Sequence, residues 1–199
     1  MNRLSLLTEQ LLFEIQKLEL PVISILNEGL SLEKLLTFST NSGYKLPENV
    51  VELYLWRNGT SLNKKKSYID MEFFPYYYFM SFDNAINVRE SLIKQQKIFK
   101  NFLNSKTPFK ENFFPIFNSL DTTFILVDCE KGNDSPLFEY ITETSSLRIC
   151  YDNIEAFLET LIECYKRRIY FKDKKNHLTV DLNREIDVIR TINKYVQLG

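Results

Sequence analysis

The sequence contains little of what most catalytic sites require. Its 199 residues include one histidine (His177), three cysteines and five isolated glycines. The pattern therefore lacks clustered Cys and His ligands for zinc, a motif for a histidine-activated nucleophile, and a glycine-rich loop for phosphate. The cysteines Cys129, Cys150 and Cys164 are odd in number and lie far apart in the sequence. We therefore expect no disulfide framework and a reducing compartment.

Long hydrophobic runs are also missing. The longest aromatic run, residues 73–80, is interrupted by Pro75 and is far shorter than the ~20 residues that a membrane helix needs. The N-terminal apolar segment carries Glu9 and Glu14, which a signal peptide would exclude. We therefore expect a cytoplasmic protein without a membrane segment.

The spacing of apolar residues predicts an α+β fold. Residues with helical spacing fill 5–20, 31–41, 47–57, 83–103, 153–166 and 181–192. Aromatic and β-branched runs predict strands over 67–80, 113–118, 123–128, 137–142, 147–151 and 178–180. The four strand candidates between 113 and 151 are spaced as in an antiparallel meander. We expect one domain over residues 22–199, with a helix in residues 1–21 packed on it.

Charge is distributed unevenly along the chain. The net charge is −1, yet residues 111–165 carry 2 basic and 11 acidic side chains, and the segments on either side are basic. Such a stretch is either neutralised inside the fold or forms a surface that attracts a basic partner.

Three glutamates in the acidic stretch share one helical face. Glu155, Glu159 and Glu163 repeat every four residues, opposite the apolar face of their helix. Like charges at this spacing destabilise an isolated helix, although Glu163 can pair with Arg167. Two interpretations remain open: a solvated face, or an acidic ridge that a basic partner neutralises.

Other acids and bases suggest weaker alternatives. Asp128, Glu130 and Asp134 could form a carboxylate site for Mg²⁺ or Ca²⁺, although we favour the simpler explanation that they lie at a strand end and in the turn that follows it. Lys64, Lys65 and Lys66 precede the aromatic run, as in proteins that bind single-stranded nucleic acid. Half of that run must face the core of any strand, and the isoelectric point of about 6.0 lacks a basic bias, so we expect no nucleic-acid partner.

A series of short motifs resembles the SUKH superfamily, the Smi/Knr cell-wall-synthesis-regulator-like proteins. The motifs occur in the family's order over about residues 22–197. They are Leu46-Pro47-Glu48, Leu53-Tyr54-x-Trp56-x-Asn58-Gly59, the segment 79–86, Phe114-Pro115-Ile116-Phe117, Leu126-Val127-Asp128, the segment 136–140, and the segment 162–170. The chain departs from the family after the fourth motif, where residues 118–123 replace the usual glycines and acids.

The resemblance implies a twisted, mainly antiparallel sheet flanked by helices. It assigns structural roles to the matching residues Pro47, Tyr54, Trp56, Gly59, Pro115 and Asp128. It also implies a protein without catalysis, cofactor or bound metal. Bacterial members of the family are mostly regarded as immunity proteins that neutralise toxin domains, often nucleases, and fungal relatives act as regulatory interaction modules.

These observations lead to a hypothesis of protein binding. We expect a bacterial immunity protein of a toxin–antitoxin system that acts as a monomer or weak dimer. Its acidic residues would face a toxin domain with a basic surface. The candidate contact residues are Asp128, Glu130, Asp134, Glu155, Glu159 and Glu163, with Tyr140 and Tyr151 as aromatic anchors. The alternatives are an intracellular regulatory scaffold and an enzyme that uses a metal bound by carboxylates such as Asp128.

Overall fold

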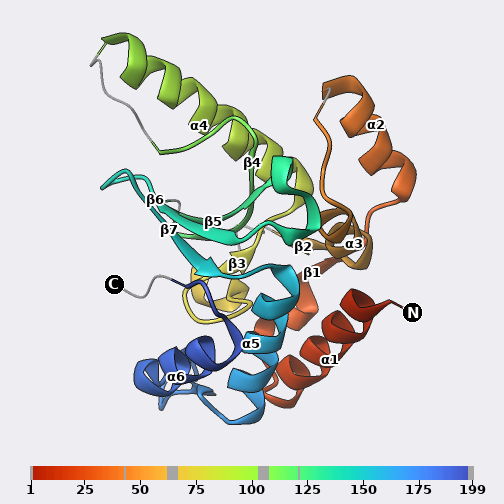
Figure 1. Cartoon of the computed structure of the whole chain (residues 1–199). Coiled ribbons are helices and arrows are strands. Elements are labelled where there is room, and N and C mark those ends of the chain that lie inside the picture. The colour runs from red at the N-terminus through yellow and green to blue at the C-terminus, as the bar shows by residue number, and fades with distance from the viewer. Residues whose placement is uncertain (1, 43, 62–66, 103–107, 121, 197–199) are drawn as a thin grey trace.

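A five-stranded antiparallel sheet forms the centre of the fold in a computed structural model that describes residues 2–42, 44–61, 67–102, 108–120 and 122–196 (Figure 1). Its strands pair in chain order: β3 (Tyr78–Phe79), β4 (Phe113–Ser119), β5 (Thr123–Asp128), β6 (Leu137–Ile141) and β7 (Ser146–Tyr151). Strands β4 to β7 form the predicted meander, so the α+β fold class expected from the sequence is confirmed.

Helices cover both faces of this sheet. In Figure 1, α4 (Phe82–Phe102) lies above the sheet and α5 (Ile154–Lys166) lies below it. The Phe157 ring of α5 packs against the Phe117 ring of β4, with centroids 5.2 Å apart. Because both faces are covered, successive residues of β4 and β5 are buried whichever way they point.

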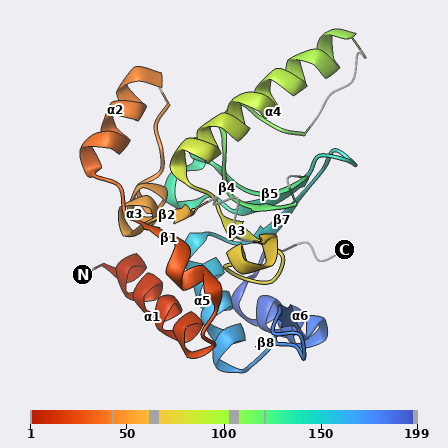
Figure 2. The same cartoon turned by 180° about the vertical axis from the view of Figure 1, so that it is seen from behind.

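The N-terminal helix packs onto the rest of the fold. Helix α1 (Arg3–Lys17) lies against α5 and against α3 (Glu48–Trp56), and Figure 2 shows α1 beside α5 from behind. Its inner face buries Leu11 and Ile15 completely. The helix begins three residues earlier than Ser5 would place it, because the side chain of Asn2 accepts a hydrogen bond from the Ser5 N–H at 2.9 Å.

The segment over 67–80 differs from the strand that its aromatic content predicts. Residues Tyr68–Met71 form a 3₁₀ turn, η2, which the reciprocal bonds of Ser67 and Asp70 cap, and only Tyr78–Phe79 is extended in the sheet. Pro75 and the positive φ of Tyr76 (73°) interrupt the intervening backbone. Burial of these aromatic side chains, and not strand pairing, explains the composition. The lysines at 64–66 and the predicted helical residue Leu103 lie outside the described residues.

The remaining elements complete the periphery. They are η1 (Pro21–Ile25), β1 (Leu26–Glu28) paired with β2 (Arg57–Thr60), α2 (Leu32–Ser42), η3 (Cys129–Asp134), β8 (Tyr170–Lys172) paired with β9 (Leu178–Val180), and α6 (Leu182–Ile192). Within the described residues, no helix combines the length and apolarity that crossing a bilayer requires.

Candidate functional site

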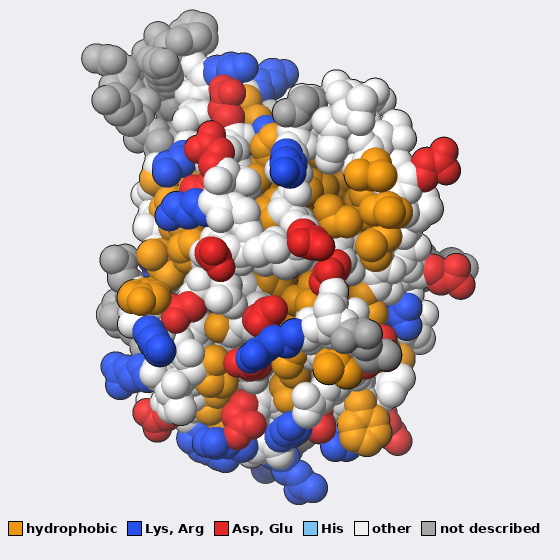
Figure 3. All heavy atoms as spheres, turned by 45° about the vertical axis from the view of Figure 1, so that its right-hand side comes forward, with side chains coloured by type: hydrophobic (Ala, Val, Ile, Leu, Met, Phe, Trp, Pro, Cys, Tyr) orange, Lys and Arg blue, Asp and Glu red, His pale blue; other side chains and the backbone are white. Residues whose placement is uncertain are grey.

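Five carboxylates gather where α1, α3, η3 and α5 meet. Glu48 and Glu52 come from α3, Glu130 and Asp134 from η3, and Glu155 from the first turn of α5. These five residues are called the acidic surface below. Figure 3 turns this side of the molecule toward the viewer and shows carboxylates close together near its centre.

A pair of asparagines holds α3 and η3 together. The backbone N–H of Asn49 donates to the side-chain oxygen of Asn133 at 3.1 Å, and Asn49 Nδ2 donates to the Asn133 carbonyl at 3.1 Å. The left-handed conformation of Gly132 (φ 63°) allows η3 to bend just before this contact. Asn49 donates both bonds to Asn133, and they hold the neighbouring residues Glu48 and Asp134 at one pocket.

Two hollows flank the start of α3 within this surface. One, of about 340 Å³, lies between α1, α3, η3 and α5, and is called the junction pocket below. Its lining residues are Asn2, Arg3, Leu4, Glu48, Asn49, Glu52, Asn133, Asp134, Asn153 and Glu155. The other, of about 540 Å³, is lined by residues that include Lys45, Pro47, Glu48, Glu130 and Asn133.

The acidic surface is incompletely neutralised. Within the described ranges, Glu48, Glu130 and Asp134 form no ion pair, and Glu130 and Asp134 are exposed. Glu52 accepts a hydrogen bond from the neutral amide of Asn2. Burial raises the pKa of Glu52, and the nearby charges of Glu48 and Glu155 raise it further. Mutual repulsion among these acids would be relieved by a cation from outside.

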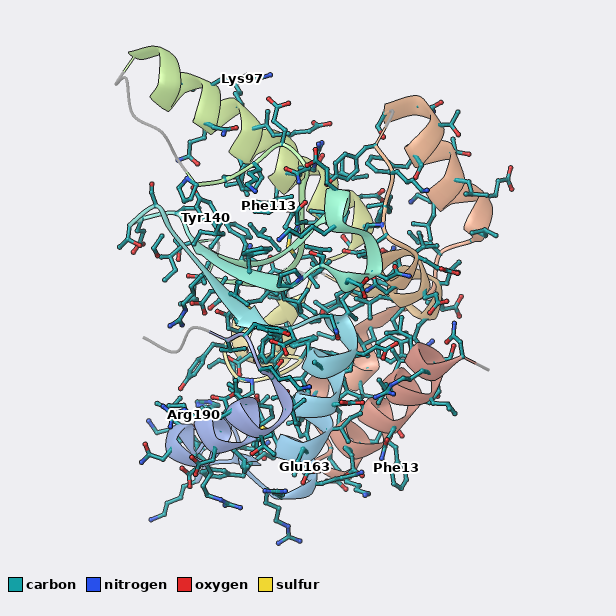
Figure 4. The ribbon with its side chains drawn as sticks, viewed as in Figure 1. Phe13, Lys97, Phe113, Tyr140, Glu163 and Arg190 are labelled. Atoms are coloured by element: carbon teal, nitrogen blue, oxygen red, sulfur yellow. The ribbon has the colours of Figure 1, made fainter. Side chains whose placement is uncertain are left out.

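The helical ridge of three glutamates is largely neutralised within the chain. Arg3 of α1 lies 2.9 Å from the Glu155 carboxylate and also pairs with Glu159. Arg167 pairs with Glu163 one turn away. Figure 4 shows Glu163 at the far end of α5, remote from the acidic surface. The structure thus joins Glu155 to the acidic surface and leaves Glu163 outside it.

Asp128 is a structural residue at the end of β5. Its side chain is 2% exposed and accepts hydrogen bonds from Asn112 Nδ2 and from the Glu130 backbone N–H. The latter bond caps the start of η3. Asp128 therefore shapes the turn that presents Glu130 and Asp134, and its buried side chain does not fit the expected contact with a partner.

The two tyrosines expected as anchors are also buried. Tyr140 packs its ring against Phe109, 5.7 Å between centroids, and Tyr151 packs against Phe157 at 4.9 Å. Their exposed fractions are 3% and 7%. Figure 4 shows Tyr140 on the sheet below α4, close to Phe113. The expectation of exposed anchors is therefore corrected, because helices and loops cover both faces of the sheet.

A third cleft lies between the sheet and α6, and two charged groups on its wall, Glu139 and Arg148, are paired with one another. It has a volume of about 430 Å³ and is lined by side chains that include Tyr77, Glu139 and Arg148. The Tyr77 hydroxyl donates to Glu139 at 2.8 Å, and Arg148 Nε donates to the same carboxylate at 2.6 Å. With both carboxylate oxygens occupied and the guanidinium paired, this trio stabilises the cleft wall and offers no free charge.

The thiols and the histidine lack the environment that activates such groups in many catalytic sites. Burial raises the pKa of the Cys129 and Cys164 thiols to about 12 and raises that of Cys150 well above its ordinary value, so all three thiols are protonated at neutral pH. His177 lies in the hairpin between β8 and β9, where its backbone N–H donates to Asp173. In the described part of the chain, no three His, Cys, Asp or Glu side chains are placed to hold a metal ion.

Comparison with known proteins identifies the family. A family model described as SMI1 / KNR4 family (SUKH-1) matches residues 29–160, about two-thirds of the chain. The chain belongs to the SUKH-1 family. No curated protein matches the sequence in a direct search. The SUKH-1 match ends within α5, so the β8–β9 hairpin and α6 follow the matched region, and α1 precedes it.

Residues of the SUKH-1 motifs hold α3 and its neighbours in place. Pro47 precedes the first turn of α3, and the Tyr54 ring is fully buried against Phe79 and Phe82. Trp56 Nε1 donates to the Glu9 carboxylate of α1 at 3.0 Å. Gly59 lies in β2 where a Cβ atom would be only 2.3 Å from the Met80 carbonyl, so the site requires glycine. Pro115 lies in β4 beside an irregularity in the β4–β5 register.

Sequence reasoning missed Glu48 and Glu52 as parts of this surface of the SUKH-1 domain. Both lie about 80 to 100 positions from their acidic neighbours, outside the acidic stretch over residues 111–165. Their signal was the helical spacing of four residues on α3, which places both acids on one face. Only the contact between α3 and η3 shows that this face adjoins Asp134.

Proposed function

We propose that this SUKH-1 protein is a non-catalytic immunity protein. It would neutralise a cognate bacterial toxin, in the cytoplasm, by binding a basic surface of the toxin domain. The observation that carries this proposal is the acidic surface, where Glu48, Glu130 and Asp134 form no ion pair with any side chain of the described residues.

The chemistry of such a toxin explains the choice of partner. A nuclease holds its substrate with Lys and Arg side chains that contact phosphates. Carboxylates held on a rigid scaffold complement the basic substrate-binding cleft of such a nuclease and exclude its anionic substrate. The Asn49–Asn133 link and the cap by Asp128 make the scaffold firm, so little ordering is needed on binding.

The state of the reactive groups supports a binding role. Protonated thiols and a histidine on a peripheral hairpin offer no activated nucleophile or paired general base. The unpaired carboxylates of the acidic surface serve instead for long-range attraction, which speeds encounter with an oppositely charged protein.

Co-expression tests the proposal. The chain is produced in cells together with the toxin domain encoded beside it, and growth is compared with cells that make the toxin alone. We expect the wild-type chain to restore growth. Continued killing by the neighbouring toxin, together with stable capture of a housekeeping protein and no toxin, would contradict immunity and favour a regulatory scaffold.

A further inference from the structure

The junction pocket presents acceptors from three separate elements. Glu52 of α3, Asp134 of η3 and Glu155 of α5 all line it, together with the side chain of Asn49. Asn153 also lines it, but its Oδ1 atom already accepts from the Ala156 N–H and caps α5. The only basic side chain among its lining residues is Arg3. A ligand that enters this pocket therefore meets carboxylate and amide oxygens from several directions.

One of these oxygens lacks a donor. Asn49 is 9% exposed, and within the described chain its Oδ1 atom has no hydrogen-bond partner. Its Nδ2 atom faces the Asn133 carbonyl at 3.1 Å, and because a carbonyl only accepts, the orientation of the amide is fixed. A buried acceptor without a donor costs free energy, which an entering N–H group would recover.

Arg3 shows that a guanidinium fits carboxylates in this region. It spans Glu155 and Glu159 from the solvent side, and its own charge is satisfied by these two acids. Glu52 accepts a hydrogen bond from the neutral amide of Asn2, and Asp134 forms no ion pair within the described ranges. The pocket thus keeps capacity for a second cationic group.

We propose that the junction pocket receives an arginine side chain of the protein partner. The planar guanidinium carries five N–H donors in a fixed fork, which suits acceptors on three elements better than the compact ammonium of lysine does. A metal ion fits less well, since the described residues contain no group of three ligands close enough to hold one. This inference rests on the proposed function, because it names the group on the partner that the acidic surface recognises.

Nuclear magnetic resonance with small probes tests the pocket directly. The peptide acetyl-Gly-Arg-Gly-amide is titrated into the isotopically labelled full chain, beside matched peptides with lysine or with neutral citrulline. We expect saturable shifts of the side-chain amides of Asn49 and Asn153 with the arginine peptide, weaker binding of the lysine peptide, and no saturation with citrulline. Equal responses to arginine and citrulline, equal affinity for lysine, or shifts confined to other surfaces would each overturn the proposal.

Isosteric variants locate the binding. Glu52→Gln and Asp134→Asn keep the side-chain shape and remove the charge. Each substitution should therefore lower the affinity for the arginine peptide by about two- to fivefold. Glu33→Gln, which removes an exposed carboxylate on α2 outside the pocket, is the matched control and should leave the affinity unchanged. Unaltered affinity in both pocket variants contradicts the assignment.

The peptide-binding experiment and the co-expression experiment can fail independently of one another. If the peptide fails to bind while the chain still protects cells from the toxin, the arginine pocket is wrong and immunity stands. If the peptide binds in the pocket and the chain gives no protection, the pocket stands as a guanidinium site and the immunity role fails.

Discussion

The guanidinium of Arg3 lies 2.9 Å from the carboxylate of Glu155, across 152 positions of sequence. This pair joins α1 to α5 and occupies one end of the acidic ridge. Because the Arg3 side chain is 65% exposed, its attraction to the ridge is screened by salt.

Arg3→Gln should therefore cause a small loss of thermal stability that disappears at high ionic strength. The melting temperature is measured in low salt and again in about 0.5 M NaCl, where the screening length falls to a few ångströms. Arg190→Gln on α6 is the control, since that exposed arginine forms no ion pair within the described residues. A loss that persists unchanged in high salt would mean that packing, and not charge, links Arg3 to α5.

Removal of the Tyr54 hydroxyl should increase stability, in contrast to the loss expected for Arg3→Gln. This hydroxyl is completely buried and has no hydrogen-bond partner within the described chain. Tyr54→Phe keeps the ring among Phe79, Phe82 and Phe114 and removes the unsatisfied group, so the free energy of unfolding should rise by about 1 kcal/mol.

Tyr165→Phe provides the matched comparison in urea unfolding. The Tyr165 hydroxyl donates to the Phe73 carbonyl at 2.7 Å, so this variant should lose about 1 kcal/mol and leave that carbonyl unsatisfied. If both variants lose stability equally, the Tyr54 hydroxyl has a partner after all.

Glu72 predicts a pH dependence of stability. Burial raises the pKa of this carboxyl, 8% exposed, from its usual 4.5 to about 7. Between pH 4.5 and 7 the folded chain binds a proton that the unfolded chain releases, so the contribution of Glu72 to stability falls as the pH rises through this window. Above pH 7 the charged carboxylate stays buried, at a cost of about 3 kcal/mol.

Glu72→Gln removes this titration. Its free energy of unfolding should be close to that of the wild type near pH 4.5 and higher than the wild type at pH 8, measured by urea unfolding at both pH values. Glu33→Gln should track the wild type at both. A difference between Glu72→Gln and wild type that does not change with pH would show that Glu72 ionises normally in the folded chain.

Alanine substitutions at two glycines should distinguish the cost of backbone strain from the cost of a steric clash. Gly59 and Gly132 both have positive φ, 64° and 63°, but a Cβ at Gly59 would meet the Met80 backbone at 2.3 Å while one at Gly132 meets nothing within 4 Å. Gly132→Ala should cost about 1–3 kcal/mol from conformation alone. Gly59→Ala should cost clearly more, because the Met80 backbone must also shift; equal losses in thermal unfolding would refute the close approach.

Local pattern predicted most of the secondary structure. The meander from β4 to β7 and the helices α3 to α6 follow from periodicity, turn residues and caps, all of which act within a few positions of sequence. The segment over 67–80 could not be placed in this way. Its aromatic residues are buried by tertiary packing, while Pro75 and Tyr76 break the strand.

The site depended on contacts that sequence spacing does not reveal. Tyr140 and Tyr151 lie on strands whose alternation cannot tell which face is exposed, and here both faces are covered. The ridge of Glu155, Glu159 and Glu163 has the predicted helical spacing, yet Arg3 reaches it from the other end of the sequence. The acidic surface itself arises from the Asn49–Asn133 contact between α3 and η3.

The rate of association with the cognate toxin domain tests the central claim most directly. The wild-type chain is compared at low and high salt with a variant that combines Glu48→Gln, Glu52→Gln, Glu130→Gln and Asp134→Asn, and with Glu163→Gln as the control outside the acidic surface. We expect the fourfold variant to associate at least about tenfold more slowly at low salt and to lose most of its salt dependence, while Glu163→Gln behaves as the wild type. An unchanged association rate for the fourfold variant would contradict the claim that this surface receives a basic partner.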